Sequence, residues 1–321
     1  MEDSPGRPLG GNPDWMSSLP DELLDVPLWS LAIPGSHDSM SFCLDKSSPV
    51  LGSEPPLLRV CDRLFPCCTR PCIDRWATTQ QSVLSDQCDL GIRYLDLRIA
   101  KKPAADDRLF FAHGIYTLIT VKEALDELAA WLDAHPREIV IICCSHFELL
   151  TDEDHGCLVE YILKLFRDKL CFPKDSLTLR SCQSKGQQVI VSYGKHDVVL
   201  KHKELWEEVP YYYANSPDPE KVIAYLEAHK SKGTPDRFFA LGLNLTEDLS
   251  YVLYHPLQTM RAMTVASLPL LLGWLSEQRP GRGGGVNIMC SDFVGLSRFC
   301  SIVIGLNYKL LAAAGPACRA P

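Results

Sequence analysis

Six side chains that can move protons or bind phosphate lie in or just after short apolar runs: His37, Asp38, Asp96, Arg98, His113 and Asp292. Asp96 and Arg98 are two residues apart, so they lie on the same face of a strand. In a barrel of parallel strands, residues at the carboxyl ends of the strands gather at one mouth. The sequence therefore predicts that two imidazoles, one guanidinium and three carboxylates converge on a single site.

Such a set suits cleavage of a phosphodiester that carries a neighbouring hydroxyl. A neutral histidine can take the proton of that hydroxyl, while a protonated histidine gives a proton to the leaving oxygen. Arg98 can hold a phosphoryl oxygen with a planar, permanently charged fork. Carboxylates beside the imidazoles fix their tautomers and stabilise the cationic form. This scheme requires no metal and no cofactor.

Each motif also has a purely structural interpretation. Asp96 and Arg98 could form an ion pair inside a barrel, and His113 beside Gly114 could cap a turn. A single His–Asp pair is more often a structural hydrogen bond than a catalytic one. The catalytic interpretation is favoured because the motifs follow one another at successive strand ends.

The elements that must position these residues follow from hydrophobic periodicity. Short apolar runs predict seven strands: Ser30–Ile33, Arg93–Ile99, Leu109–Ala112, Ile139–Cys144, Gln188–Tyr193, Phe238–Leu243 and Val286–Cys290. Apolar residues at three- and four-residue spacing predict the main helices: Val121–Ala134, Glu153–Arg167, Pro219–Ser231, Val265–Glu277 and Phe299–Ala312. The stretch 44–79 has no clear strand and is expected to hold helices and a loop.

Strands that alternate with helices indicate a parallel sheet with helices outside it. We expect a single α/β domain, an irregular (β/α)8-like TIM barrel over residues 14–312, with a disordered tail at 1–13 and a C-terminal tail at 313–321. No glycine-rich dinucleotide fingerprint follows the first strand, which weakens the doubly wound alternative.

Composition and charge make some classes of binding partner and some cellular compartments less favoured than others. The net charge of −8 argues against broad electrostatic binding to nucleic acid or to acidic membranes. No apolar run reaches the roughly 18 residues of a membrane-spanning helix, and the N-terminus does not resemble a signal peptide. Fourteen cysteines without a disulfide-like arrangement fit a reducing compartment. We therefore expect a cytoplasmic protein; the oligomeric state is left open.

Three motifs, in order, resemble the X region of phosphatidylinositol-specific phospholipase C: residues 33–39 (Ile-Pro-Gly-Ser-His-Asp-Ser), 91–98 (Gly-Ile-Arg-Tyr-Leu-Asp-Leu-Arg) and 111–114 (Phe-Ala-His-Gly). The resemblance is closest to the small animal proteins that contain only the X domain, and it extends over residues 14–310. It implies an irregular TIM-type barrel that cleaves phosphatidylinositol to diacylglycerol and an inositol phosphate, through a 1,2-cyclic phosphate.

The resemblance also implies roles for the motif residues. His37 would be the general base that activates the inositol 2-hydroxyl, with Asp292 orienting it. His113 would be the general acid for the diacylglycerol leaving group, supported by Asp38. The substrate would be a membrane phosphoinositide, reached by peripheral contact with the bilayer.

Arg98 would stabilise the phosphoryl group, with Asp96 beside it. In the large calcium-dependent eukaryotic enzymes the matching position is an acidic calcium ligand, whereas the bacterial secreted enzymes share the arginine. A fixed cation at this place repels Ca²⁺ and does part of its electrostatic work. We therefore expect a metal-independent reaction.

Headgroup recognition departs from the bacterial pattern. Where the bacterial enzymes place a lysine after the fourth strand, this chain has Cys-Ser-His at 144–146. Candidate substrate-binding residues are Ser145, His146, Tyr193, Trp206 and Tyr212. Trp206 and the run of tyrosines at 211–213 could form an aromatic rim that touches lipid, and an ordinary packing role is the alternative.

Two other functions remain alternatives. A glycerophosphodiester phosphodiesterase shares the barrel class but normally uses metal-binding carboxylates, which Arg98 and the scarcity of clustered glutamates disfavour. A lipid-binding or scaffold protein with slow turnover could retain the same barrel.

Overall fold

The computed structural model describes residues 11–103, 108–173, 177–232, 236–255, 257–281 and 283–313. Eight strands form one continuous parallel path in the order β7 (Trp206–Glu207), β6 (Val189–Tyr193), β5 (Val140–Glu148), β2 (Tyr94–Lys101), β1 (Ile33–Ser36), β10 (Ile288–Ser291), β9 (Ala240–Gly242) and β8 (Tyr211–Tyr212). The sheet curls, and its two edge strands are not paired with each other within the described residues. The expected α/β barrel is thus confirmed as a curled half-barrel.

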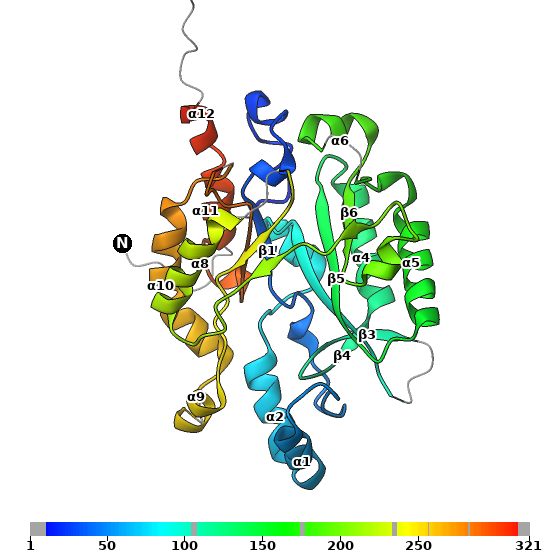
Figure 1. Cartoon of the computed structure of the whole chain (residues 1–321), viewed down its shortest axis with the longest axis vertical. Coiled ribbons are helices and arrows are strands. Elements are labelled where there is room, and N and C mark those ends of the chain that lie inside the picture. The colour runs from blue at the N-terminus through cyan, green and yellow to red at the C-terminus, as the bar shows by residue number, and fades with distance from the viewer. Residues whose placement is uncertain are drawn as a thin grey trace, which may run out of the picture.

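Helices cover the outside of the curled sheet (Figure 1). Those beside β5 and β6 are α4 (Val121–Ala134), α5 (Asp152–Phe166) and α6 (Leu179–Lys185), and those on the other side are α8 (Pro219–His229), α10 (Met260–Glu277), α11 (Phe299–Leu306) and α12 (Lys309–Ala313). Shorter elements are α3 (Leu84–Leu90), α7 (His196–Val199) and the 3-10 turns at Asp21–Leu23, Leu28–Ser30, Ser41–Cys43, Arg167–Lys169, Lys230–Lys232 and Val294–Leu296.

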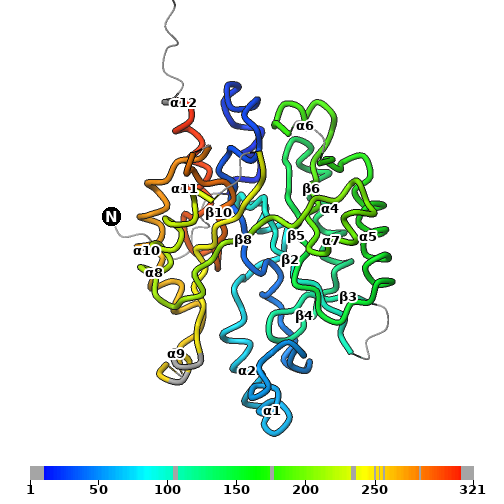
Figure 2. Tube along the Cα trace, in the orientation of Figure 1, coloured from blue at the N-terminus to red at the C-terminus, as the bar shows by residue number. Residues whose placement is uncertain are grey.

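Three helices extend from one end of the molecule. Helices α1 (Pro56–Leu64) and α2 (Pro66–Ala77) form a hairpin, and α9 (Leu249–Tyr254) lies at the same end, as the chain trace in Figure 2 shows. The helices expected within residues 44–79 are confirmed. They follow strand β1, so they lie at the end of the sheet where the predicted active-site residues gather.

Helix α4 shows how local sequence sets an element. Thr120 accepts a hydrogen bond from the backbone N–H of Glu123, and the Glu123 side chain accepts one in return, which forms a capping box. Leu125, Leu128 and Leu132 are buried on one face. The predicted bounds of this helix are confirmed.

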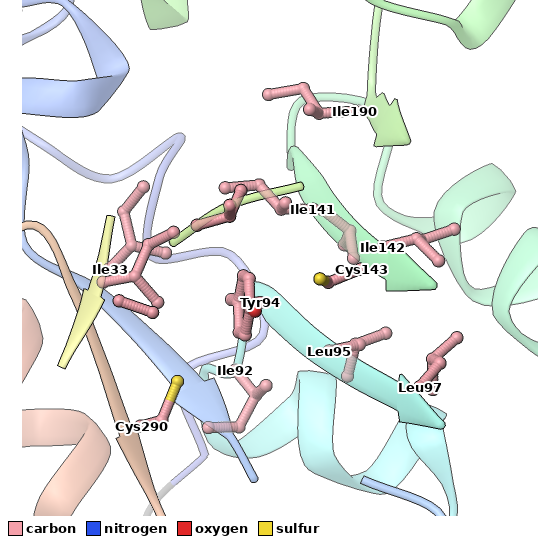
Figure 3. Packing of buried hydrophobic residues seen from close by; sticks show 14 of the residues in the cluster. Ile33, Ile92, Tyr94, Leu95, Leu97, Ile141, Ile142, Cys143, Ile190 and Cys290 are labelled. Carbon is pink, nitrogen blue, oxygen red and sulfur yellow. The ribbon is translucent and has the colours of Figure 1, made fainter. Parts of the chain in front are cut away.

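Alternation along β2 separates the hydrophobic core from the active-site face. Figure 3 shows Tyr94 between Cys143 and Cys290, in the interior of the half-barrel. Asp96 and Arg98 follow at the same period-two positions, while Leu95 and Leu97 are fully buried on the opposite face, toward the helices. The predicted shared face of Asp96 and Arg98 is therefore confirmed.

The first strand lies further along the chain than predicted. Residues 28–30 form a 3-10 turn, and β1 runs through the Pro-Gly-Ser stretch up to Ser36. Gly35 makes this possible, because a Cβ there would lie 2.7 Å from the Cys290 sulfur. The prediction ended the strand before proline and glycine, whereas here they allow β1 to fit tightly between β2 and β10.

The third predicted strand belongs to a hairpin. Strand β3 (Leu109–His113) pairs antiparallel with β2 and with β4 (Ile115–Thr120), a strand that was not predicted. The turn lies at Gly114, whose φ of 70° is readily adopted only by glycine. His113 is therefore carried back toward Arg98 by a hairpin and not by a parallel strand end, as had been expected.

Candidate active site

The predicted acid–base residues meet at one end of the half-barrel. His37 and Asp38 follow β1, Asp96 and Arg98 lie on β2, His113 ends β3, and Asp292 follows β10. All but Arg98 and His113 are almost completely buried. The structure thus brings together the six residues that the sequence singled out.

His37 is held from both ring nitrogens. Its Nδ1 lies 2.8 Å from Asp292 Oδ1, and its Nε2 lies 3.0 Å from Arg98 Nη2. A guanidinium can only donate hydrogen bonds, so the Nε2 atom of neutral His37 accepts and its Nδ1 proton is donated to Asp292. This tautomer leaves a lone pair on Nε2, the form that a general base needs.

His113 is held in the matching way. Its Nδ1 lies 2.7 Å from the carbonyl oxygen of Ala77, which can only accept, so Nδ1 carries a proton. Its Nε2 faces Asp38 Oδ2 at 3.3 Å, and the same oxygen is 3.2 Å from His37 Nε2. The centroids of the two imidazole rings are 6.1 Å apart, in an edge-to-face arrangement. Both reactive nitrogens therefore face a common point.

Two buried carboxylates position Arg98. Its Nε is 2.5 Å from Asp38 Oδ1 and 3.7 Å from Asp96 Oδ2. Asp96 is itself fixed, since it accepts the backbone N–H of Asp38 at 3.1 Å and the Ser145 hydroxyl at 3.5 Å. The guanidinium is thus clamped on one side, and 23% of the Arg98 side chain remains exposed.

The backbone at Asp38 is strained, and a glutamine supports it. Asp38 has a φ of 42°, a left-handed conformation that is uncommon for a non-glycine residue. The Gln80 side chain donates to the carbonyl oxygens of His37 and Ser291, each at 3.0 Å, and so links the ends of β1 and β10. Sequence reasoning missed Gln80, because a glutamine between two loops carries no periodic or motif signal.

Burial and neighbouring charges shift the pKa values of the two histidines in opposite directions. Burial lowers the pKa of His37, but Asp38 and Asp292 outweigh it and the pKa is raised overall. Burial also lowers the pKa of His113, and there it prevails over the attraction of Asp38. The Asp38 carboxyl is buried, yet Arg98 and the two imidazoles hold its pKa below the usual value, whereas burial raises the pKa of Asp292.

The same carboxylates could also attract a metal ion. His37, Asp38 and Asp96 offer ligand atoms within 4.8 Å of one another. The guanidinium of Arg98, however, already contacts both carboxylates. A dication would compete with that fixed cation for the same oxygens, so the donor set fits the arginine better than a divalent metal.

Comparison with curated proteins identifies the family. The chain is 50% identical over 298 residues to PI-PLC X domain-containing protein 1 of Danio rerio, covering 92% of this chain and 96% of that protein. It is 46% identical to the Homo sapiens protein of the same name, over 94% of each chain. The chain belongs to the PI-PLC X domain-containing proteins. PI-PLC X domain-containing protein 3 of Danio rerio is 38% identical over 97% of this chain. No family model matches the chain.

Solved structures share the fold of this X-domain protein. The phosphatidylinositol-specific phospholipase C of Listeria monocytogenes superposes with a TM-score of 0.64 at 20% identity, over 92% of this chain and 99% of that one. A Staphylococcus aureus phosphatidylinositol-specific phospholipase C, solved in work on its membrane binding, gives 0.65 at 18% identity over 92% and 98%. Likeness at this level shows a common barrel.

A pocket of about 250 Å³ adjoins Arg98 in this X-domain protein. Ser145 and His146, expected to bind substrate, both line it, and the Ser145 hydroxyl lies 2.9 Å from His146 Nδ1. Tyr211 and Tyr213 also line it. We call it the headgroup pocket, after the part of the substrate that the sequence predicts would bind here; Asp96 and Arg98 line it together with the two tyrosines.

Three expected substrate-binding residues lie elsewhere. Tyr193 is buried and its hydroxyl is 2.7 Å from His155 Nδ1. Trp206 donates from Nε1 to the Cys171 carbonyl oxygen at 2.8 Å, and the Tyr212 ring packs 5.9 Å from that of His229. None of the three lines the headgroup pocket.

The period-two alternation of a strand could have selected the correct tyrosines. Tyr211 and Tyr213 share one face, and Tyr212 points to the other. Tyr211 donates to Asn244 Oδ1 at 2.8 Å, and its ring lies 6.0 Å from that of His37. These two tyrosines therefore adjoin the site that the sequence had assigned to their neighbour.

Proposed function

We propose that the protein cleaves the phosphodiester of a phosphatidylinositol-type lipid and releases diacylglycerol and an inositol phosphate. The observation that carries this proposal is the pair of imidazoles whose Nε2 atoms face one carboxylate oxygen, with Arg98 beside them. Membership of the X-domain family and the barrel shared with phosphatidylinositol-specific phospholipases C support a phospholipase-type role.

The reaction needs two proton transfers. His37 Nε2 takes the proton of the inositol 2-hydroxyl, and the resulting oxygen attacks phosphorus. The bond from phosphorus to the glycerol oxygen breaks, and His113 donates a proton to that oxygen as diacylglycerol leaves. The product is a 1,2-cyclic phosphate; in a second step water opens the ring, with the two histidines exchanging roles and returning to their first protonation states.

Arg98 supplies the fixed positive charge for this scheme. Its clamped position beside Asp38 and Asp96 places a donor next to the headgroup pocket without further reorganisation. Preorganised donors of this kind stabilise negative charge that develops on phosphoryl oxygens in the transition state. The proposed reaction is therefore metal-independent.

The pKa directions have a consequence for substrate binding. A general acid must be protonated, yet burial lowers the pKa of His113, while the pKa of His37 is raised. In the free site these directions favour a proton on His37 over one on His113. A bound phosphodiester anion near His113 would raise the pKa of that imidazole, because an opposite charge favours the protonated form. The substrate thus helps to create the productive protonation state.

Contact with the membrane would be peripheral. No helix among the described residues combines the length and apolar character needed to cross a bilayer. Large apolar side chains are instead exposed at the end that carries α1 and α9: Leu64 (65%) in α1, Phe65 (62%) directly after it and Tyr254 (83%) in α9. Apolar surface of this kind on one end favours docking onto a lipid interface.

Product analysis tests the proposal. We expect phosphatidylinositol vesicles incubated with the protein in EGTA to yield diacylglycerol and water-soluble inositol phosphate in equal amounts, with the cyclic phosphate visible by ³¹P NMR. Phosphatidic acid with free inositol would mean cleavage on the other side of phosphorus. No product from a folded protein that binds the vesicles would favour the lipid-binding scaffold.

A further inference from the structure

A second, larger cavity opens beside the site, on the side of His113. Its volume is about 440 Å³, and it shares no lining residue with the headgroup pocket. Its walls come from α1, α2 and the segment that carries α9, which cluster at one end of the molecule (Figures 1 and 2). We call it the helix groove.

We infer that the helix groove binds an acyl chain of the lipid whose phosphodiester lies between the two histidines. This inference rests on the proposed function and narrows its substrate. The protein would act on a lipid molecule whose acyl chain has left the bilayer core and lies in the groove. The headgroup pocket would hold the polar half of the same molecule.

The lining of the groove suits hydrocarbon. Leu58 and Cys61 of α1, Ile73 and Trp76 of α2, and Val252 of α9 present apolar surface to it. Burial of an acyl chain against such walls is favourable in proportion to the apolar area removed from water. The volume lies within the range of natural sites for small ligands.

The position of the groove matches the leaving group. His113 lines the groove, whereas Arg98 lines the headgroup pocket. In the proposed reaction His113 protonates the glycerol oxygen, so the diacylglycerol half of the substrate must lie on the His113 side. The groove therefore continues from the reacting atoms toward the part of the lipid that carries the chains.

The charged residues that line the two cavities lead to the same assignment of headgroup and acyl chain. Glu54 and Glu247 line the helix groove. Burial raises the pKa of both carboxyls, that of Glu247 to about 7. When ionised they repel a phosphate, and when protonated they add no positive charge. Asp96 and Glu208 line the headgroup pocket as well, but there Arg98 adds a fixed positive charge, whereas the described lining of the groove has no lysine or arginine. The anionic headgroup is thus directed to Arg98, and the uncharged half of the lipid to the groove.

Trp76 gives the groove a rigid aromatic wall. It lines the groove, and its ring packs edge-to-face against that of Tyr251, with the ring centroids 6.0 Å apart. Leu57, 63% exposed at the groove margin, marks where a chain would enter from the membrane.

Lipids that differ in acyl-chain length, offered as dissolved monomers and not in a membrane, test the inference. Inositol phospholipids with two butanoyl or two hexanoyl chains, both kept below their critical micelle concentrations, are compared by kcat/KM. We expect an increase of up to about fourfold for each methylene that the groove covers, the factor that corresponds to transfer of one methylene from water. Equal values for the two lipids would overturn the inference.

Two groove-filling variants and one control locate the effect. Cys61→Trp on α1 and Val252→Trp on α9 should abolish the preference for hexanoyl chains and leave the butanoyl lipid nearly unaffected. Val60→Trp, on the same helix as Cys61 but outside the groove, should keep the preference. If both groove variants retain the wild-type preference, or lower kcat/KM for both lipids equally, the groove does not bind the chain.

A binding measurement separates this inference from the proposed reaction. Calorimetric titration with dihexanoylglycerol, a product analogue without phosphate, requires no catalysis. We expect wild type to bind it more tightly than dibutanoylglycerol, and Cys61→Trp to bind both equally weakly. Binding without turnover of any lipid would contradict the proposed function only, whereas turnover without chain-dependent binding would contradict the groove only.

Discussion

Two arginines at opposite ends of one short sequence, residues 93–98, lie in opposite environments. Arg93 immediately precedes β2 and is completely buried. Its Nε and Nη2 donate to Glu138 Oε2 at 3.1 and 2.7 Å, and its Nη1 donates to the carbonyl oxygens of Cys88 and Ile92 at 2.7 and 2.8 Å. Every nitrogen of this guanidinium has a fixed protein acceptor.

Arg98, five residues later, is held on one side only. Asp38 and Asp96 contact Nε, and Nη2 reaches His37, while part of the side chain borders the headgroup pocket. Arg93 therefore joins the elements beneath β2, and Arg98 keeps donors near a cavity. An arginine whose donors are all satisfied contributes to folding; one that is clamped beside a cavity can bind a ligand.

Truncation of Arg93 is the largest expected perturbation of stability. Arg93→Ala leaves Glu138 as an uncompensated buried charge and should lower the free energy of unfolding by about 3–5 kcal/mol. Urea denaturation measures this loss. The exposed neighbour Arg137 is the control, since Arg137→Ala should change stability by no more than about 0.5 kcal/mol. An equally small loss for Arg93→Ala would contradict a structural role.

At Arg98 we expect the opposite: a loss of turnover without a loss of stability. Arg98→Lys keeps the charge but removes the fork, and should lower kcat on phosphatidylinositol by about 10²–10³-fold, the typical cost of one transition-state donor. Its thermal denaturation midpoint should stay near that of wild type. Arg93→Lys is the matched variant: it should lose stability while the folded fraction retains its turnover. If the two variants behave alike, the contrast between the arginines fails.

The pH profile sharpens the account of the histidine pair. The proposed productive state has neutral His37 and protonated His113, so kcat/KM should be bell-shaped in pH. The high-pH limb follows the group with the raised pKa, His37. Asp292 raises that pKa, so Asp292→Asn should move the high-pH limb to lower pH. A limb that does not move, or a shift of the low-pH limb alone, would rule out this pairing.

The smallest expected effect concerns Tyr193, which lies outside both cavities. Tyr193→Phe removes the hydrogen bond to His155 and should cost about 1 kcal/mol of stability. Because the residue contacts neither cavity, turnover should be unchanged. A clear rise in KM would instead return Tyr193 to the substrate-binding residues.

Sequence periodicity predicted the residues of the site better than the elements that carry them. The common face of Asp96 and Arg98 and the burial of α4 followed from periods of two and of 3.6 residues. The position of β1 did not, because Gly35 and its proline neighbour act through close packing against Cys290, a contact distant in sequence.

The hairpin and the tyrosines were missed for related reasons. Strand β4 follows β3 after a single glycine. The sequence pattern therefore predicted one strand followed by a loop, where the structure has two strands. At residues 211–213 the alternation groups Tyr211 with Tyr213, and the pairing of β8 with β9 turns these two toward the pocket. Long-range pairing decided both features.

Turnover of phosphatidylinositol vesicles in EGTA and in Ca²⁺, by wild type and His37→Ala, tests the central claim most directly. A two-histidine site with a fixed arginine predicts equal inositol phosphate release in both conditions by wild type. It predicts loss of release in His37→Ala at a temperature well below the denaturation midpoint of that variant. Release that requires Ca²⁺, or that persists in His37→Ala, would contradict a metal-independent mechanism based on His37.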